Sequence, residues 1–254
     1  MCTLTFIPRD NSYYLAMNRD ERTSRGVADP PALVDLGGSR SIYPRDHAGG
    51  TWIAANEQGI AFALLNWNDV QPAGVPPTAS RSRGLVIPAL VPFSSHREAD
   101  MALSRLDLKN TLPFRLIGVF PGEAKIVEWR WEGKHLESEA YSWDSRSHYH
   151  WFSSSISDKQ ASALRGAACE NAWDENSADA GSLPWLRKLH ASHANGPGPF
   201  SVCVHRESVA TLSYTEIVSS QESVECNYFS GSPCTMTGFG CSVKIERKAA
   251  AARE

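Results

Sequence analysis

Short apolar runs separated by turn residues dominate the first 70 positions and predict antiparallel strands. Residues 2–7 (CTLTFI) and 13–18 (YYLAMN) flank the turn residues PRDNS. Residues 51–56 (TWIAAN) and 60–67 (IAFALLNW) flank NEQG, whose Gly59 suits the positive φ of a hairpin turn. Two hairpins are therefore expected in this part of the chain.

Two stretches around the second hairpin lack such periodicity. Residues 22–50 are rich in Gly, Pro, Asp and Arg, and residues 70–80 (VQPAGVPPTAS) are rich in Pro. We expect the first to be a long surface excursion that forms a lid or one wall of a pocket, because long loops inside compact domains tend to be functional. The second is expected to be a connection without regular structure.

The rest of the chain groups its helical and strand-like segments. Helical spacing of apolar residues predicts helices at 82–91, 95–106, 157–170 and 182–194. Strands are expected in a meander across 113–141, in a hairpin within 201–217 and at 223–229. Because the order lacks the regular β–α alternation of a parallel sheet, we predict a layered α+β fold with antiparallel sheets. We expect one domain over 1–254, with 246–254 as an exposed tail.

The composition of the chain argues against some classes of partner. Apolar residues make up 42% and charged residues 21% of the 254 positions, with a formal net charge of -3. This balance gives no electrostatic reason to expect nucleic acid or an anionic membrane as a partner. No apolar run reaches the about 18–20 residues that span a bilayer, and no secretory signal is recognised at the start. A cytoplasmic protein acting on a small molecule is expected; its oligomeric state is open.

Cysteine and histidine spacing does not predict a metal site or any cofactor. No CxxC pair occurs among the six cysteines, and the spacing of Cys226, Cys234 and Cys241 does not fit a zinc template. The paired histidines, interpreted as surface or partly buried side chains, are His148 with His150 and His190 with His193. A chain of this length without a secretory signal is expected to keep its thiols reduced.

The candidate chemistry begins at Cys2. Removal of Met1 would leave Cys2 with a thiol and a free α-amine, a nucleophile and a base on one residue. The segment NRDE (Asn18–Glu21) ends the second predicted strand and would return beside Cys2, with alternate residues on opposite faces. Arg19 would favour the thiolate and Asp20 would orient the amine. The alternative is that these charges pair in a solvated turn and Cys2 is an inert strand residue.

Three motifs in order, MCTLTF, NRDER and GGTWIAANEQGIAFALLNW, resemble the NRDE family, also known as the transport and Golgi organisation protein 2 family. The match covers residues 1–67 and extends to SRG at 82–84. That family is similar to N-terminal nucleophile (Ntn) hydrolases of the penicillin V acylase and bile-salt hydrolase type. The resemblance implies a four-layer αββα sandwich of two antiparallel sheets, in agreement with the predicted element order.

The resemblance also implies roles for individual residues. Cys2 matches the nucleophile, Asp20 the aspartate that contacts the α-amine, and Arg19 the active-site arginine. Asn66 matches the asparagine that helps to form an oxyanion hole, and Arg206 is the counterpart of a distal active-site arginine. These five residues form the predicted catalytic set.

Further residues are predicted to line the substrate site. The hydrolases have a second asparagine where this chain reads WFSSSISD, so Ser154 or Ser155 would take its place. A serine hydroxyl donates a hydrogen bond but is shorter, which puts efficient amide hydrolysis in question. Trp52, Phe62 and Trp67 lie on the hairpin beside the proposed site. They would form an apolar pocket there or, alternatively, pack in the core.

We therefore predict an Ntn-type cysteine hydrolase or acyltransferase that acts on a C–N amide, ester or thioester bond of a small molecule. The resemblance leaves a second possibility, a non-catalytic protein that binds or traffics haem, acyl-CoA or lipid on the same scaffold. A third is a structural or interaction module in which Cys2 is inert.

Overall fold

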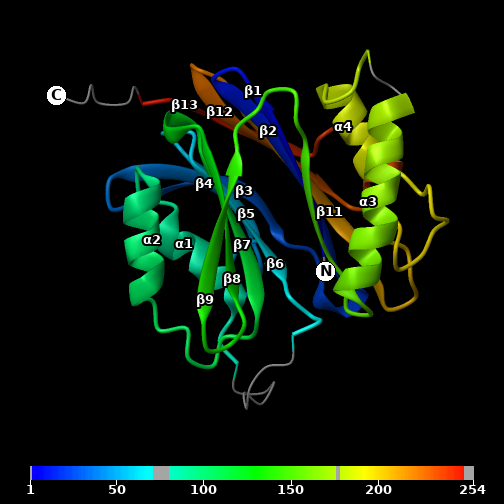
Figure 1. The fold of residues 1–254 in the computed structure, drawn as a ribbon, viewed down its shortest axis with the longest axis horizontal. Coiled ribbons are helices and arrows are strands. Elements are labelled where there is room, and N and C mark those ends of the chain that lie inside the picture. The colour runs from blue at the N-terminus through cyan, green and yellow to red at the C-terminus, as the bar shows by residue number, and fades with distance from the viewer. Residues whose placement is uncertain (1, 71–79, 176–177, 249–254) are drawn as a thin grey trace.

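The fold is a four-layer sandwich in a computed structural model that describes residues 2–70, 80–175 and 178–248. Two antiparallel sheets face each other in the middle (Figure 1). Helices α1 (Val86–Leu90) and α2 (His96–Arg105) cover the outside of one sheet, and α3 (Asp158–Glu175) and α4 (Leu183–His190) cover the outside of the other. The predicted α+β, αββα class is confirmed.

Each sheet is a continuous set of antiparallel neighbours. In spatial order, the six-stranded sheet contains β10 (Tyr149–Ser153), β1 (Cys2–Arg9), β2 (Ser12–Arg22), β11 (Val209–Ser219), β12 (Ser223–Ser230) and β13 (Cys241–Glu246). The seven-stranded sheet contains β3 (Asp29–Leu36), β4 (Ser39–Arg45), β5 (Ile53–Asn56), β6 (Ala61–Asn66), β7 (Phe114–Phe120), β8 (Lys125–Trp131) and β9 (Leu136–Ser142). Short 3-10 helices are η1 (Thr23–Arg25), η3 (Arg83–Leu85), η4 (Pro121–Glu123) and η5 (Pro233–Thr235).

Strand alternation divides the apolar side chains between three buried layers. On β1, Leu4 and Phe6 point between the sheets, where they meet residues of β5, β6 and β7. Thr3 and Thr5 point to the opposite face and are fully buried beneath the helices. Two further apolar clusters lie under the α1–α2 and α3–α4 layers. The helix-facing side of β1 and β2 therefore carries buried polar groups that need partners from α3, α4 and the loops around them.

The stretch 22–50 differs from the predicted loop, because it contains the hairpin β3–β4. The chain turns at Gly37 and Gly38, both with positive φ, and residues 32–36 of β3 pair with β4. β3 is the edge strand of its sheet and carries Pro30 and Pro31 beside an irregularity in the register. Proline is tolerated at a sheet edge because no hydrogen bond between inner strands is lost. The prolines of this stretch therefore indicated a loop where the structure has the edge strand β3.

Two differences concern the end of the chain. The predicted hairpin within 201–217 is reduced to an isolated antiparallel bridge between His205 and Ala210. Of its two arms only β11 is a strand, and residues 201–204 form a loop over the helix-facing side of the sheet. β13 (Cys241–Glu246) was not predicted and pairs with β12. Arg247 donates to the carbonyls of Ser220 and Gln58, so ordered contacts continue into the segment expected to be a tail.

The other predicted elements lie close to their expected positions. The meander across 113–141 is β7, β8 and β9, and the two pairs of helices are α1 with α2 and α3 with α4. Most of the predicted Pro-rich connection (71–79) and the last residues of the tail (249–254) lie outside the described residues. None of the helices in the described ranges combines the length and apolar character that crossing a bilayer would need.

Candidate active site

A cleft of about 360 Å³ opens where the first residue of β1 meets the end of β6. Residues that line it and matter for chemistry are Cys2, Arg19, Asp20, Trp52, Asn66 and Arg83. They come from β1, β2, the GGTW segment, β6 and η3. The structure therefore brings together four of the five residues predicted to be catalytic and one of the predicted substrate-binding residues.

Cys2 is held in the middle of a sheet, between two neighbours. Its Cα pairs with Arg19 of β2 and with Ser153 of β10, and its side chain is 7% exposed. Burial raises the pKa of the thiol, and the charge of Asp20 acts in the same direction. A hydrogen bond with the Asp20 backbone and the charge of Arg19 lower the pKa but do not offset burial. Cys2 therefore needs a base to become a nucleophile.

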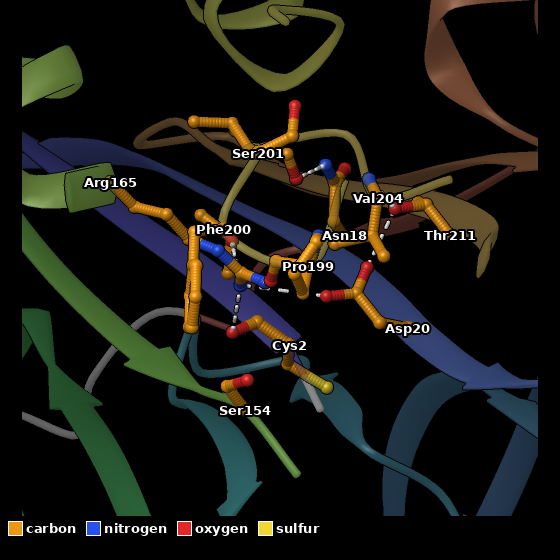
Figure 2. Close-up of polar contacts among 12 residues, drawn as sticks. Cys2, Asn18, Asp20, Ser154, Arg165, Pro199, Phe200, Ser201, Val204 and Thr211 are labelled. Carbon is orange, nitrogen blue, oxygen red and sulfur yellow. Dashed lines mark hydrogen bonds and ion pairs between the residues drawn. The ribbon is translucent and has the colours of Figure 1, made fainter. Parts of the chain in front are cut away.

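Asp20 lies beside Cys2, with its carboxyl group between Arg165 and Thr211 on the helix-facing side of the sheet (Figure 2). Its Oδ1 accepts a hydrogen bond of 2.6 Å from Thr211 Oγ1 on β11, and its Oδ2 lies 3.5 Å from Arg165 Nη1 on α3. Burial raises the pKa of Asp20, whereas the charge of Arg165 and the Thr211 hydroxyl lower it. Strand β11 and helix α3 therefore fix the carboxyl group from two sides.

Arg165 also holds the backbone of the candidate nucleophile. Its Nη1 donates to the Cys2 carbonyl at 3.2 Å and to Thr3 Oγ1 at 2.9 Å, and its Nη2 donates to the Pro199 carbonyl at 3.0 Å. The side chain is fully buried. Sequence reasoning missed Arg165 and Thr211. A lone arginine on the buried side of a helix was the available signal for the first; nothing in the pattern singled out the second.

Arg19 points to the side of β2 opposite Asp20, as strand alternation predicts. Its guanidinium carbon lies 4.6 Å from the centre of the Trp52 ring, and Nη2 lies 3.5 Å from Glu21 Oε2. This cation–π contact places Trp52 at the wall of the cleft and positions a positive charge beside the thiol.

The GGTW and SRG motifs meet at the cleft. The Thr51 backbone N–H donates to the Gly84 carbonyl at 3.0 Å, and a Cβ on Gly50 would lie 2.9 Å from the Gly84 carbonyl carbon. Arg83 donates to the Pro113 carbonyl at 3.0 Å, and its charge interacts with Cys2. The sequence assigns no role to the SRG segment, and the structure places its arginine, Arg83, in the cleft.

The remaining predicted residues are not among those that line the cleft. Phe62 is fully buried under the α1–α2 layer, where its ring lies 5.8 Å from Phe120. Trp67 is half-buried just beyond β6, and Arg206 is half-buried in the loop before β11.

The two serines predicted to replace an asparagine lie beyond β10. Ser154 is buried and its backbone N–H donates to Asp158, whereas Ser155 is exposed. Ser153, which the sequence analysis did not single out, is the residue directly beside Cys2. A shift of one position in a strand exchanges the two faces of the sheet, so the choice between neighbouring serines depends on a register that sequence does not reveal.

Side chains that could ligate a metal ion gather elsewhere in the described part of the chain. Cys2 is the only histidine or cysteine among the described residues that line the cleft. Groups with metal-ligating side chains close together lie at His148, His150 and Glu170 and at a second cluster beyond α4. The six cysteines are free in the structure.

Comparison with the solved structure of a bile acid hydrolase agrees with this fold. The C2A variant of the conjugated bile acid hydrolase from Clostridium perfringens aligns with a TM-score of 0.56 at 12% identity, over 97% of this chain and 92% of that one. Penicillin V acylase from Agrobacterium tumefaciens aligns with a TM-score of 0.49 at 14% identity, over 97% and 91%. No curated protein gives a significant sequence match. The profile of the Transport and Golgi organisation 2 family matches residues 1–180, and the chain belongs to that family.

Proposed function

We propose that this protein is an Ntn-type cysteine hydrolase or acyltransferase of the cytoplasm. Its reaction would cleave a C–N amide, ester or thioester bond of a small molecule. The observation that carries the proposal is the position of Cys2, which begins an inner strand beside Arg19 and lines the cleft together with Arg19, Asn66 and Arg83. The bile acid hydrolase that shares this fold was studied as a variant of its own cysteine at position 2.

Removal of Met1 would supply the base that the buried thiol needs. The α-amine of Cys2, with an ordinary pKa of about 7.7–8.0, is partly unprotonated at neutral pH and would take the thiol proton. The thiolate then adds to the acyl carbon, forming a C–S bond. The leaving nitrogen, oxygen or sulfur departs with the proton returned by the α-ammonium. Water, deprotonated by the same amine, would hydrolyse the acyl-enzyme; another nucleophile in its place would give acyl transfer.

Asn66 would stabilise the oxygen that becomes negatively charged during the addition. It ends β6 at the cleft, half-buried, and its side-chain NH₂ is a donor of the kind used in oxyanion holes. Asp20, Arg165 and Thr211 would act as positioning residues, because they hold the Cys2 carbonyl and the carboxyl group beside it. This arrangement fixes the nucleophile before the substrate arrives.

The charges of the cleft favour an acyl compound with an anionic group. Arg19, Arg25, Arg81 and Arg83 line it, against the acidic residues Asp20, Glu21 and Asp46. Arg25 is 3.3 Å from Glu21 and 3.8 Å from Asp46, so those charges are largely compensated at one end. Arg83, mostly buried, is a second guanidinium, beside Arg19, whose charge interacts with Cys2, and it would bind a carboxylate or phosphate near the reacting atom.

The test begins with the intact mass of the purified protein, which must correspond to loss of Met1. Iodoacetamide should then label Cys2 stoichiometrically, and acyl amides, esters and thioesters with and without a carboxylate should be screened for turnover. Cys2→Ala should abolish both labelling at this position and turnover, whereas Cys241→Ser, at a half-buried site away from the cleft, should retain both. Retained Met1, or turnover that survives Cys2→Ala, would contradict the proposal. Saturable binding of haem, acyl-CoA or lipid without turnover would favour the carrier function instead.

A further inference from the structure

Four potential metal ligands converge on the side of the α3–α4 layer, outside the cleft. They are His193, Cys203, His205 and Cys234, and their ligating atoms all lie within 4.8 Å of one another. They come from three segments: His193 from the turn after α4, Cys203 and His205 from alternate positions of the 199–205 loop, and Cys234 from η5 after β12. Residues separated by up to 41 positions therefore share one small volume, which the sequence spacing of the cysteines did not indicate.

Two of the distances among these atoms match the edges of a tetrahedral site, and all of the others lie within 4.8 Å. His205 Nε2 lies 3.5 Å from Cys203 Sγ and 3.3 Å from Cys234 Sγ, and the rings of His193 and His205 are 4.9 Å apart. A tetrahedron with Zn–S bonds of about 2.3 Å and Zn–N bonds of about 2.0–2.1 Å has N···S edges of about 3.6 Å. The ligands are therefore already about as close as a bound ion would hold them.

We propose that His193, Cys203, His205 and Cys234 form a structural zinc site. Two thiolates and two imidazoles are a ligand set that suits Zn²⁺, and with four protein ligands the coordination is complete, which is typical of a structural ion. Binding would release the two thiol protons to solvent and involves no change in oxidation state. Cys203 is fully buried and Cys234 is exposed, so the site has an anchored side and a route of entry.

The zinc site would brace the loop that supports the candidate active site. Val204 lies between the ligands Cys203 and His205, and its backbone N–H donates to Thr211 Oγ1 at 2.8 Å. The same hydroxyl donates to Asp20 Oδ1, as Figure 2 shows. The ion would therefore fix the loop whose backbone positions the Thr211–Asp20 pair, although zinc binding itself does not depend on the proposed catalysis.

Other bonds anchor the same loop on its far side. The Val202 carbonyl accepts a hydrogen bond of 2.8 Å from Asn18 Nδ2, and the Pro199 carbonyl accepts one from Arg165. The Cys203 backbone N–H donates to the Ser192 carbonyl at 3.1 Å, beside the ligand His193. The ligands are thus attached to a backbone that is held in place on both sides, as a preformed metal site requires.

The experiment uses the full-length protein, reduced and freed of metal with a chelator, and titrates it with Co²⁺ and then Zn²⁺. We expect one ion per chain, a visible spectrum typical of tetrahedral cobalt with thiolate charge-transfer absorption, and replacement of cobalt by zinc. Cys234→Ser, at an exposed position that should not impair folding, should weaken binding beyond the about 10–100-fold typical of second-shell changes. Cys241→Ser provides the matched control, because Cys241 lies outside the cluster, and it should bind like the unsubstituted protein.

A second measurement keeps folding and binding apart. Thermal unfolding of the apo protein should shift to higher temperature on adding Zn²⁺, and this shift should be absent in Cys234→Ser and present in Cys241→Ser. Absence of metal binding by the reduced folded protein would overturn the proposal. So would cobalt spectra without thiolate absorption, undiminished affinity in Cys234→Ser, or isolation of the protein with Cys203 and Cys234 joined as a disulfide that zinc does not prevent.

Discussion

Arg165 and Asp20 form an ion pair between the helix layer and the strand that faces the candidate nucleophile. Nη1 of Arg165 lies 3.5 Å from Oδ2 of Asp20, and both side chains are fully buried. The same nitrogen donates to the Cys2 carbonyl. Arg165 therefore couples the packing of α3 against the sheet to the position of Cys2. A substitution that shifts α3 should also shift Cys2 in the cleft.

Arg165→Met should lower the free energy of unfolding by about 3–5 kcal/mol, because it removes the guanidinium that pairs with the buried Asp20 carboxylate. Urea titration followed by tryptophan fluorescence measures this. The matched control is Arg146→Met, whose side chain is 90% exposed and should change stability by no more than about 0.5 kcal/mol. Equal stabilities of the two variants would show that the buried pair does not contribute.

The arrangement around Cys2 was predictable where it is local. The hairpin between residues 2–7 and 13–18 has a short turn, and turn length fixes the register that pairs Cys2 with Arg19. Alternation then places Asp20 and Arg19 on opposite faces. The pairing of Cys2 with Arg19 and the opposite orientation of Asp20 both depend on residues close together in the chain, so the sequence pattern predicts them.

The supporting contacts were not predictable because they are distant in the chain. Arg165 and Thr211 approach Asp20 from sequence separations of 145 and 191 residues, through a helix and a strand whose patterns are ordinary. Cys234 likewise meets Cys203 and His205 only after β11 and β12 have turned back. Which buried groups meet depends on how the layers pack, and periodicity specifies faces but not partners.

Gly50→Ala should distort the cleft, because its Cβ would lie 2.9 Å from the Gly84 carbonyl carbon, where neither backbone can move aside cheaply. We expect the free energy of unfolding to fall by about 1–3 kcal/mol, as is typical of overpacking. We also expect iodoacetamide to label Cys2 more slowly, because the distorted cleft would make the thiol less accessible. Gly122→Ala is the matched control, since a Cβ there meets no atom within 4 Å. If Gly50→Ala matched that control in both assays, the close approach of the two motifs would not shape the site.

Asn66→Ala tests the oxyanion role within the proposed function. On a substrate found in the activity screen, kcat should fall by about 10²–10³, as removal of one oxyanion donor does elsewhere. Labelling of Cys2 by iodoacetamide serves as the internal control, because alkylation develops no oxyanion and should keep its rate. Loss of labelling together with turnover would mean that Asn66 shapes the cleft, and unchanged kcat would exclude it from the oxyanion hole.

His190→Gln should flatten the decline of stability toward acid pH. His190 is fully buried, with Nε2 3.0 Å from Thr5 Oγ1, and burial lowers the pKa of its imidazole to about 3. An unfolded histidine titrates near about 6.5, so between these values the unfolded chain binds one more proton than the folded one. The neutral, buried His190 therefore contributes its full stabilisation above the pKa that it has in the unfolded chain. That contribution is lost as pH falls toward its pKa in the folded protein, by up to about 1.4 kcal/mol per pH unit.

Urea unfolding between about pH 7 and about pH 4 measures that slope. In His190→Gln the slope should decrease by the contribution of one proton, while a decline remains because burial also lowers the pKa of His150, whose Nδ1 lies 2.9 Å from the same Thr5 hydroxyl. His135→Gln replaces an exposed histidine and should leave the slope unchanged. An identical slope in His190→Gln and the unsubstituted protein would mean that His190 takes up its proton without unfolding, through a local opening of the α4 layer over β1.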